Sequence, residues 1–174
     1  MKEVQLETER LFLRTYRLSD FEDHFKLCAD PDVMRFLIGG KPLSRFEAWR
    51  HMALLVGHWH LLGFGHWAVE EKATGEFVGR IGLLNPEGWP GFEIGWTLGR
   101  QFWGKGYATE GARRALSYAF NELDKAHVIS LIHPDNKGSI RVAERLGEKP
   151  EGKTELLGTE VLIYGIDRPA SQSS

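Results

Sequence analysis

Residues 96–110 of the chain read Trp96-Thr97-Leu98-Gly99-Arg100-Gln101-Phe102-Trp103-Gly104-Lys105-Gly106-Tyr107-Ala108-Thr109-Glu110. This stretch predicts a strand, a glycine-containing turn and the start of a helix. Gly104 and Gly106 allow the backbone to turn tightly and to approach a ligand closely. A helix that begins near Gly106 leaves several N–H groups without helical partners, and the positive end of its dipole adds to them. With Arg100 and Lys105 beside it, the turn predicts an anion site that suits a pyrophosphate.

Three kinds of phosphate loop can be compared with this turn. A nucleotide-triphosphate loop needs a Ser or Thr after its lysine, and here Gly106 follows Lys105. A dinucleotide-binding loop needs a third glycine where this chain has Thr109, and it opens a βαβ unit at the start of a chain. The third pattern, Gln/Arg-x-x-Gly-x-Gly/Ala, is met in full by Gln101, Gly104 and Gly106. The sequence therefore favours the third pattern.

Length and composition predict one globular domain over residues 1–168 and a disordered tail over 169–174. The chain has 174 residues, of which 42% are hydrophobic and 26% charged. The net charge of -2 and the absence of a basic stripe predict no DNA partner. The longest apolar run, 52–56, is too short to cross a membrane. The single cysteine, Cys28, cannot form an internal disulfide, so we expect a reducing, cytoplasmic compartment and a packing role for Cys28 on a helix.

Periodicity and turn residues predict an α/β fold with a mixed sheet flanked by helices. Ser19 and Asp20 are expected to cap a helix that ends before Pro31, and Ser44 and Glu47 have capping-box spacing for a helix through residue 62. Two further helices are expected from about residue 106 and over 136–146. The predicted strands are about 10–16, 66–71, 77–84, 92–98, 128–132, 151–157 and 160–166.

The strand over 92–98 alternates between two kinds of residue. One face carries four apolar side chains, and the other carries a carboxylate, a glycine and a hydroxyl: Phe92, Ile94, Trp96 and Leu98 against Glu93, Gly95 and Thr97. This pattern indicates that one face packs against a core and the other is available for chemistry.

The segment 101–110 resembles the acetyl-coenzyme A signature of the GCN5-related N-acetyltransferase (GNAT) superfamily. Residues 6–11 resemble the opening of its ribosomal-protein N-acetyltransferase branch. Residues 134–139, followed by 144–147, resemble the Asn-x-x-Ser helix of that branch, and 161–164 resemble its last strand. The resemblance spans about residues 6–168. The chain departs from the pattern at Glu148, where the branch has an apolar residue.

The resemblance implies a central, mostly antiparallel twisted sheet flanked by helices. It also implies transfer of an acetyl group from acetyl-CoA to a primary amine, by direct attack in a ternary complex. Both a protein N-terminus and a small molecule stay open as the acceptor, and a homodimer is one of the oligomeric states left open. A non-catalytic acyl-CoA-binding domain is the alternative function. Retention of Glu93, Asn136 and Ser139 together favours an enzyme.

The same resemblance assigns a cofactor-binding set to the strand end, the turn and the helix after the next strand. Its members are Trp96, Thr97, Leu98, Arg100, Gln101, Phe102, Trp103, Gly104, Lys105, Gly106, Tyr107, Ala108, Thr109, Asn136, Ser139 and Arg141. The backbone over 96–98 is expected to polarise the thioester carbonyl, provided that strand pairing is broken there.

Three residues are predicted to handle protons. An alkyl amine has a pKa of roughly 10, so a base must deprotonate it, and Glu93 is the candidate by resemblance. The alternative is a solvent-facing Glu93 without a catalytic role. Ser139 and Tyr107 are candidate donors to the leaving thiolate. Asn136 can instead cap the helix that Ser139 enters, and such capping is compatible with a bond from Asn136 to the pantetheine arm.

The histidines raise the question of a metal site. His51 and His58 are a heptad apart on one predicted helix, but no carboxylate or Cys joins them in the sequence, so no metal site is predicted. The six tryptophans are expected to be mostly core or loop anchors.

Overall fold

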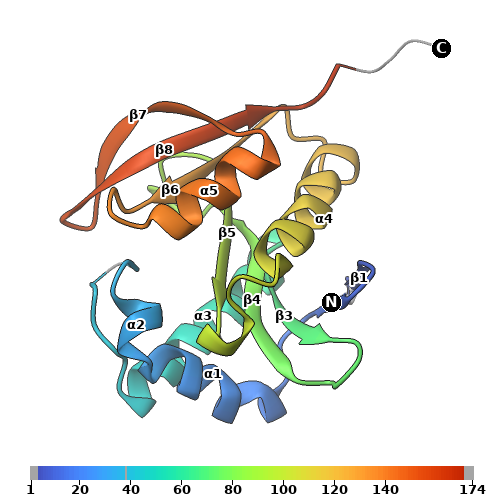
Figure 1. Ribbon diagram of the computed structural model, residues 1–174, viewed down its shortest axis with the longest axis vertical. Coiled ribbons are helices and arrows are strands. Elements are labelled where there is room, and N and C mark those ends of the chain that lie inside the picture. Colours follow the sequence, from blue (N-terminus) through green and yellow to red (C-terminus); the bar gives the residue numbers. More distant parts are fainter. Residues whose placement is uncertain (1–3, 38, 171–174) are drawn as a thin grey trace.

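The computed structural model describes residues 4–37 and 39–170 and contains one sheet of eight strands in the order β1-β2-β3-β4-β5-β6-β8-β7 (Figure 1). All neighbouring strands are antiparallel except β5 and β6, which are parallel. The mostly antiparallel, mixed sheet is as predicted. The strands are β1 Leu6–Glu7, β2 Leu11–Arg14, β3 His66–Glu71, β4 Phe77–Leu84, β5 Glu93–Leu98, β6 His127–Ile132, β7 Lys149–Leu156 and β8 Thr159–Asp167.

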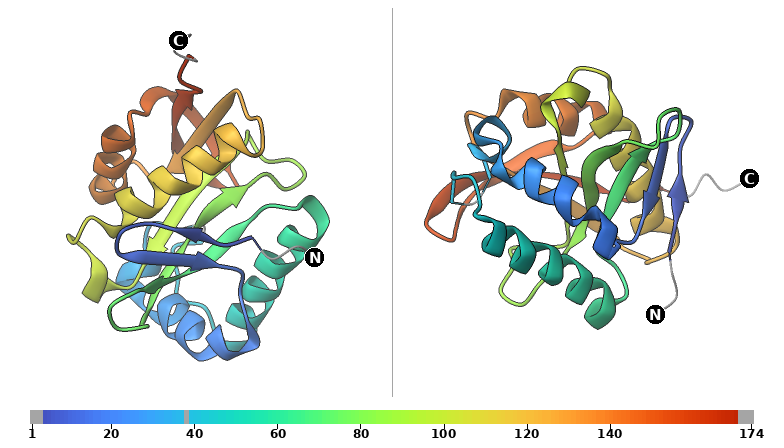
Figure 2. Two further views of the ribbon diagram at one scale, coloured as in Figure 1. Left: turned by 90° about the vertical axis from the view of Figure 1, so that its right-hand side faces the viewer. Right: turned by 90° about the horizontal axis from the view of Figure 1, so that it is seen from below.

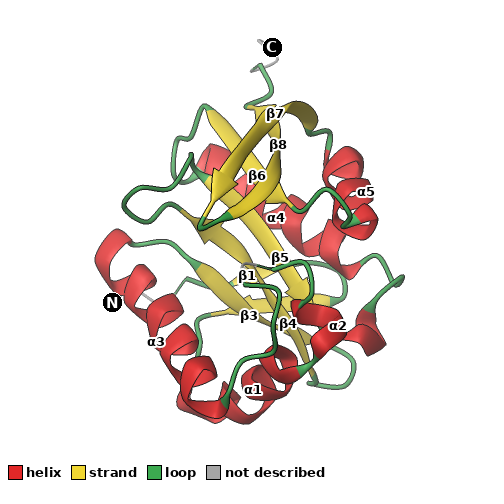
Figure 3. Ribbon diagram, turned by 90° about the vertical axis from the view of Figure 1, so that its left-hand side faces the viewer, coloured by secondary structure: helices red, strands yellow, loops and turns green. Residues whose placement is uncertain are grey.

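Helices cover both faces of the sheet (Figure 2). Helices α1 and α3 pack against each other on one face, whereas α4 and α5 lie on the other (Figure 3). The helices are α1 Phe21–Ala29, α2 Pro31–Met34, α3 Arg45–Leu62, α4 Tyr107–Asn121 and α5 Lys137–Leu146, with short 3-10 turns η1 Leu18–Asp20 and η2 Arg100–Phe102. No helix in the described ranges is long and apolar enough to cross a membrane.

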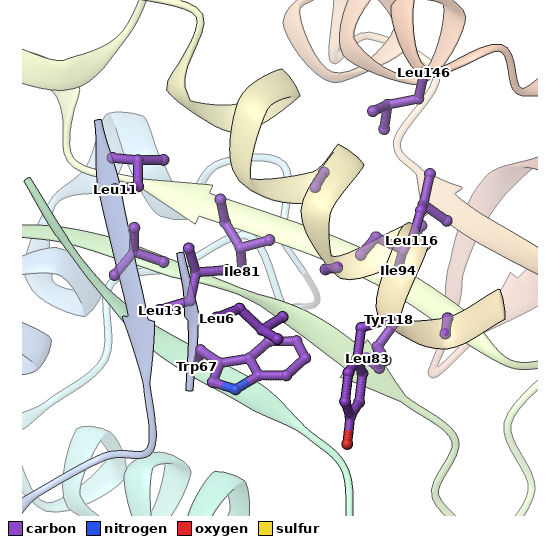
Figure 4. Packing of buried hydrophobic residues seen from close by; sticks show 14 of the residues in the cluster. Leu6, Leu11, Leu13, Trp67, Ile81, Leu83, Ile94, Leu116, Tyr118 and Leu146 are labelled. Carbon is purple, nitrogen blue, oxygen red and sulfur yellow. The ribbon is translucent and has the colours of Figure 1, made fainter. Parts of the chain in front are cut away.

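The main hydrophobic core lies between α4 and strands β1 to β5 (Figure 4). Ala112, Ala115 and Ala119 of α4 are small and fully buried, so the helix comes close to the sheet. The approach is tightest at Gly111, where an added Cβ would lie 2.4 Å from Ile81 Cδ1. The apolar face of β5, which includes Ile94, belongs to this core, as its alternation predicts.

Local capping signals are confirmed at α3. The Ser44 and Glu47 side chains form the predicted capping box, and Gly63 ends the helix in the left-handed conformation. The cap predicted for the first helix is wrong, because the Asp20 carboxylate binds the Arg14 guanidinium at 2.7 Å instead of capping α1. That ion pair joins residues from different elements, and the short range of a capping signal does not reveal it.

The segment around Pro31 shows a second difference. Helix α1 ends at Ala29 as predicted, but Asp30 then caps a further short helix, α2, with Pro31 at its first position. Proline suits this position because its missing N–H would have no helical partner there. Strand β1 and helix α2 were not predicted. The predicted tail 169–174 lies partly outside the described residues.

Packing at Gly111 generates a test of the core. Gly111→Val should lower the free energy of unfolding by about 1–3 kcal/mol, because the added side chain pushes α4 away from Ile81. Urea denaturation measures the change. In the control Gly57→Ala, within α3, the added Cβ meets nothing within 4 Å, so this change should raise stability by about 0.5–1 kcal/mol. Equal stability of wild type and Gly111→Val would contradict the packing argument.

Candidate active site

Strands β5 and β6 diverge after a single registered pair. Within the described residues, pairing between them is limited to Glu93 and Ile129, whereas β5 pairs with β4 along its whole length. Hydrogen-bonded pairs alternate along an antiparallel ladder. Because the Gly99 N–H donates to Val78 O at 3.0 Å, the main-chain groups of Trp96 and Leu98 face the other way, toward β6. Beyond Glu93 and Ile129, β5 and β6 have no further registered pair among the described residues, which supports the expectation of broken pairing over 96–98.

The turn between β5 and α4 presents main-chain N–H groups. Gly104 and Gly106 both have positive φ, 75° and 82°, which glycine adopts without strain. Gly106 is the N-terminal cap residue of α4, and no described side chain caps this helix. The first helical bond runs from the Glu110 N–H to Gly106 O, so the N–H groups of 107–109 have no partner within α4. This helix end therefore has the free N–H groups on which the prediction of an anion site rests.

The cations around this site include a residue that was not predicted. The Arg100 guanidinium binds Asp30 at 2.7 Å and Asp32 at 3.0 Å, and its role as a charge beside the phosphate site stays a prediction. Arg10 also lies at the turn: it donates to Lys105 O at 2.9 Å and forms an ion pair with Glu110 at 2.6 Å. It is too far away in sequence for local patterns to find.

A hollow of about 630 Å³ opens beside the α4 N-terminus. Four arginines line it, from the β1–β2 segment, α4 and α5: Arg10, Arg113, Arg114 and Arg145. None of the four was predicted as a site residue. Gly106 and Thr109 also line it. The Thr109 hydroxyl is buried and has no hydrogen-bond partner among the described residues.

The remaining residues of the predicted cofactor-binding set fall into a buried group and an exposed group. Thr97, Leu98, Phe102 and Tyr107 are buried, and Ala108 is partly buried. Gln101, Trp103, Lys105 and Arg141 are exposed. The Trp103 indole donates to Leu98 O at 2.8 Å, which fixes the turn against the end of β5. The buried members hold the turn in shape, and the exposed ones are free to meet a ligand.

Three of the predicted residues meet across the gap between β5 and α5. The Trp96 indole donates to the Ser139 hydroxyl at 3.2 Å. Asn136 caps α5 by accepting from the Ser139 N–H at 3.1 Å, as predicted. Ser139 therefore lies within reach of the strand edge, with its own hydroxyl proton free to donate elsewhere. Tyr107 is placed differently, because its hydroxyl donates to the Glu71 carboxylate at the end of β3. This bond disfavours Tyr107 as a donor to the thiolate.

Glu93 lies on the opposite face of β5 and is not solvent-facing. Its side chain is only 9% exposed, and the Trp89 indole donates to its carboxylate at 2.6 Å. Burial raises the pKa of Glu93 to about 7, while the bond from Trp89 and the charge of Arg80 oppose that rise. A carboxylate with such a pKa can gain and lose a proton at neutral pH.

His66 and Arg80 surround Glu93, and neither was predicted. A Cβ built at Gly95 would lie 3.4 Å from the His66 ring and 3.8 Å from Glu93 Oε1, so both side chains lie close to the same glycine. Arg80 bonds to His66 Nδ1 at 3.0 Å. Burial lowers the pKa of His66, so the ring is neutral, and its Nε2 has no partner among the described residues. The signal in the sequence was only that His66 and Arg80 are polar residues next to apolar strand positions, and the strand register that brings them together was not predictable.

Glu148, the residue that departs from the motif, is also buried. It is 3% exposed, and its Oε1 lies 3.0 Å from the Ser130 hydroxyl, which also lies 3.0 Å from Ile94 O. A hydroxyl has one proton and can donate to only one of these oxygens. A protonated Glu148 can donate to Ser130, which then donates to Ile94. Burial raises the pKa of Glu148 to about 8, in agreement with a neutral acid.

The histidine prediction needs correction at one position. His58 is separate from His51, because it contacts Phe64 O at 2.7 Å and accepts from the Asn85 N–H at 3.2 Å. His51, however, is joined by a cysteine: Cys28 Sγ lies 4.0 Å from His51 Nδ1. Cys28 and His51 are on different helices, so their proximity depends on helix packing.

The chain is similar to several known proteins. A protein-family model described as an acetyltransferase (GNAT) domain matches residues 10–149. YkkB, an uncharacterized protein of Bacillus subtilis, is 38% identical over 152 residues, which cover 83% of this chain and 84% of YkkB. The chain belongs to the GNAT family of acetyltransferases.

Other GNAT relatives agree with this assignment. The FsC-acetyl coenzyme A-N(2)-transacetylase of Aspergillus fumigatus is 38% identical over 133 residues, covering 71% of this chain and 56% of that protein. An acetyltransferase structure from Agrobacterium tumefaciens has a TM-score of 0.86 at 29% identity, covering 97% of this chain and 96% of that one. RimL, a ribosomal L7/L12 acetyltransferase solved with coenzyme A, shares the fold, with a TM-score of 0.77 at 18% identity over 94% of this chain and 98% of that one.

The buried Glu148 generates a pH-dependent stability test. An unfolded glutamate has a pKa of about 4.3, so between about pH 5 and 8 the folded protein holds a proton that the unfolded chain has released. The free energy of unfolding should therefore fall as pH rises, by up to about 1.4 kcal/mol per pH unit from this group. Urea denaturation at several pH values should show a shallower fall for Glu148→Gln. The exposed control Glu144→Gln should keep the wild-type slope, and a wild-type slope in Glu148→Gln would refute a neutral Glu148.

Proposed function

We propose that this GNAT acetyltransferase moves an acetyl group from acetyl-CoA to a primary amine. The observation that carries the proposal is the uncapped N-terminus of α4, which lies at the end of a strand that has separated from its neighbour. An anion site and an adjacent main-chain gap suit a ligand with a diphosphate followed by a narrow, amide-containing arm. Coenzyme A has both parts.

Each part of the donor has candidate partners. The diphosphate would accept from the N–H groups of the turn over 104–109, with Lys105 and Arg10 nearby. The pantetheine arm would follow the gap between β5 and β6, where the Trp96 and Leu98 main chain faces it and Asn136 lies across it. The same main-chain N–H groups would stabilise negative charge as it develops on the thioester oxygen.

Proton movement is assigned to two side chains. Glu93 removes a proton from the acceptor amine, for which a pKa of about 7 is suitable at neutral pH. The amine then attacks the thioester carbon directly, in a complex that holds donor and acceptor together. As the C–S bond breaks, the Ser139 hydroxyl, held by Trp96, donates a proton to the leaving thiolate and takes up the proton that the nitrogen of the tetrahedral intermediate loses, so the serine is neutral again. Burial of Glu93 and its bond from Trp89 keep the carboxylate in one orientation.

The acceptor is either a protein N-terminus or a small-molecule amine. Both present the same amine to Glu93, and the related transacetylase of Aspergillus fumigatus carries an N(2) amine acceptor in its name. We further propose a cytoplasmic location, where acetyl-CoA and a reduced Cys28 would coexist. Release of free coenzyme A thiol with a panel of amines tests catalysis. Stabilisation by acetyl-CoA without turnover of any amine would support a non-catalytic binding domain instead.

The donor site is tested at the turn. Gly106→Val should abolish acetyl-CoA binding in calorimetry, because its side chain would stand where the diphosphate meets the α4 N-terminus. Gly106 has a φ of 82°, so backbone strain has to be controlled. Gly158→Val, at a φ of 80° in the β7–β8 turn, introduces similar strain far from the site and should leave binding unchanged. Wild-type affinity in a folded Gly106→Val protein would show that the turn does not hold the donor.

The base is tested through the pH profile. Since Glu93 acts only when deprotonated, kcat/KM of the wild type should rise with pH through about 7. Glu93→Gln should lower kcat by about 10²–10⁴-fold and remove this rise below the pKa of the amine. Glu87→Gln, an exposed change in the loop before β5, should keep both rate and profile. An unchanged inflection in Glu93→Gln would remove Glu93 from the mechanism.

A further inference from the structure

A second cluster of polar side chains lies between α1 and α3, the two helices that pack together on the Glu93 face of the sheet (Figure 3). His24 and Cys28 are one turn apart on α1, and His51 faces them from α3. His24 and Cys28 are buried, at 0% and 2% exposure, while His51 is partly exposed. The ligand atoms of the three residues all lie within 4.8 Å of one another. The proposed acetyl transfer uses none of them.

The separations of these atoms match those around one tetrahedral metal ion. His24 Nε2 lies 3.1 Å from His51 Nδ1, and Cys28 Sγ lies 3.5 Å from the first and 4.0 Å from the second. Zinc bonds of about 2.0–2.1 Å to nitrogen and 2.3 Å to sulfur at tetrahedral angles give about 3.3 Å between two nitrogens and about 3.6 Å between nitrogen and sulfur. The side chains would therefore need to move by only a few tenths of an ångström.

The surroundings suit ligands of this kind. The Tyr16 hydroxyl lies 3.2 Å from His24 Nδ1, so it can accept from that nitrogen and leave Nε2 for a metal, as a supporting residue does in metal sites. Burial lowers the pKa of His24 to about 4 and that of His51 to about 2, so both rings are neutral and have lone pairs to offer. Burial raises the pKa of the Cys28 thiol, whereas the positive charge of Arg80 favours its thiolate.

We propose that His24, Cys28 and His51 bind one zinc-class divalent cation that ties α1 to α3. Two imidazoles and one thiolate are a donor set that borderline-soft cations prefer over magnesium or calcium. On binding, the metal–sulfur bond replaces the S–H bond of Cys28, and the proton leaves to solvent. The partly exposed His51 gives access to the site, and a water or an external ligand takes the fourth position. This inference is independent of the proposed acetyl transfer.

Cobalt titration of the metal-free, full-length protein tests the site. With Co²⁺ as a probe for Zn²⁺, we expect one equivalent to produce tetrahedral visible absorption and thiolate-to-cobalt charge transfer in the near ultraviolet. One equivalent of Zn²⁺ should bleach both and raise the melting temperature. If the folded wild type shows neither band, or only the spectrum of octahedral cobalt, the proposal is overturned.

Variants locate the ion. Cys28→Ser should remove the charge-transfer band, and His24→Gln should weaken Co²⁺ binding by about tenfold or more. His60→Gln, at an exposed position on the same helix as His51, is the matched control and should change the affinity by less than about twofold. Circular dichroism checks that each variant folds. Loss of binding in His60→Gln, or an intact charge-transfer band in Cys28→Ser, would place the ion elsewhere and refute this site.

Discussion

The separation of β5 from β6 is the constraint on which the site depends. One registered pair, Glu93 with Ile129, holds the two strands together, and beyond it the edge of β5 is left to other partners. A main-chain edge without a neighbouring strand has polar groups that need hydrogen bonds. In this protein, the strand edge that needs hydrogen bonds is followed by a helix N-terminus that no described side chain caps. Among the described residues, the departure from sheet pairing leaves part of the β5 edge without a neighbouring strand, and the start of α4 adds free N–H groups to the same region.

Burial then sets the chemistry on the two sides of β5. Glu93, His66 and Arg80 gather on the side of α1 and α3, where loss of water raises the pKa of the acid and lowers that of the imidazole. On the side of α5, burial keeps Glu148 protonated. The pKa values of both carboxyl groups are therefore higher than those of exposed glutamates, for the same reason. Both carboxyl groups lie next to β5, so their protonation states depend on how closely the surrounding elements pack and not on the amino-acid composition of the chain.

The predictions that succeeded depend on short-range rules. The capping box at Ser44, the cap at Asn136 and the alternation of β5 are each set by residues within a few positions of one another. Those that failed depend on distant partners. Asp20 looked like a helix cap but binds Arg14, and Cys28 looked separate from the histidines but its Sγ lies 4.0 Å from His51 Nδ1. The sequence shows which residues are polar or charged, but only the fold shows which partner each of them binds.

By itself, the sequence determined the family through the resemblance of its motifs. It also determined the glycine turn and the strand that carries Glu93, because steric limits on the backbone and the period of a strand act locally. Only the tertiary structure decided how far Glu93 is buried, that His66 and Arg80 surround it, and that Cys28 meets two histidines. Each of these depends on segments brought together by strand register and helix packing. The order of the residues does not directly show strand register or helix packing, because both depend on the free energy of the whole core.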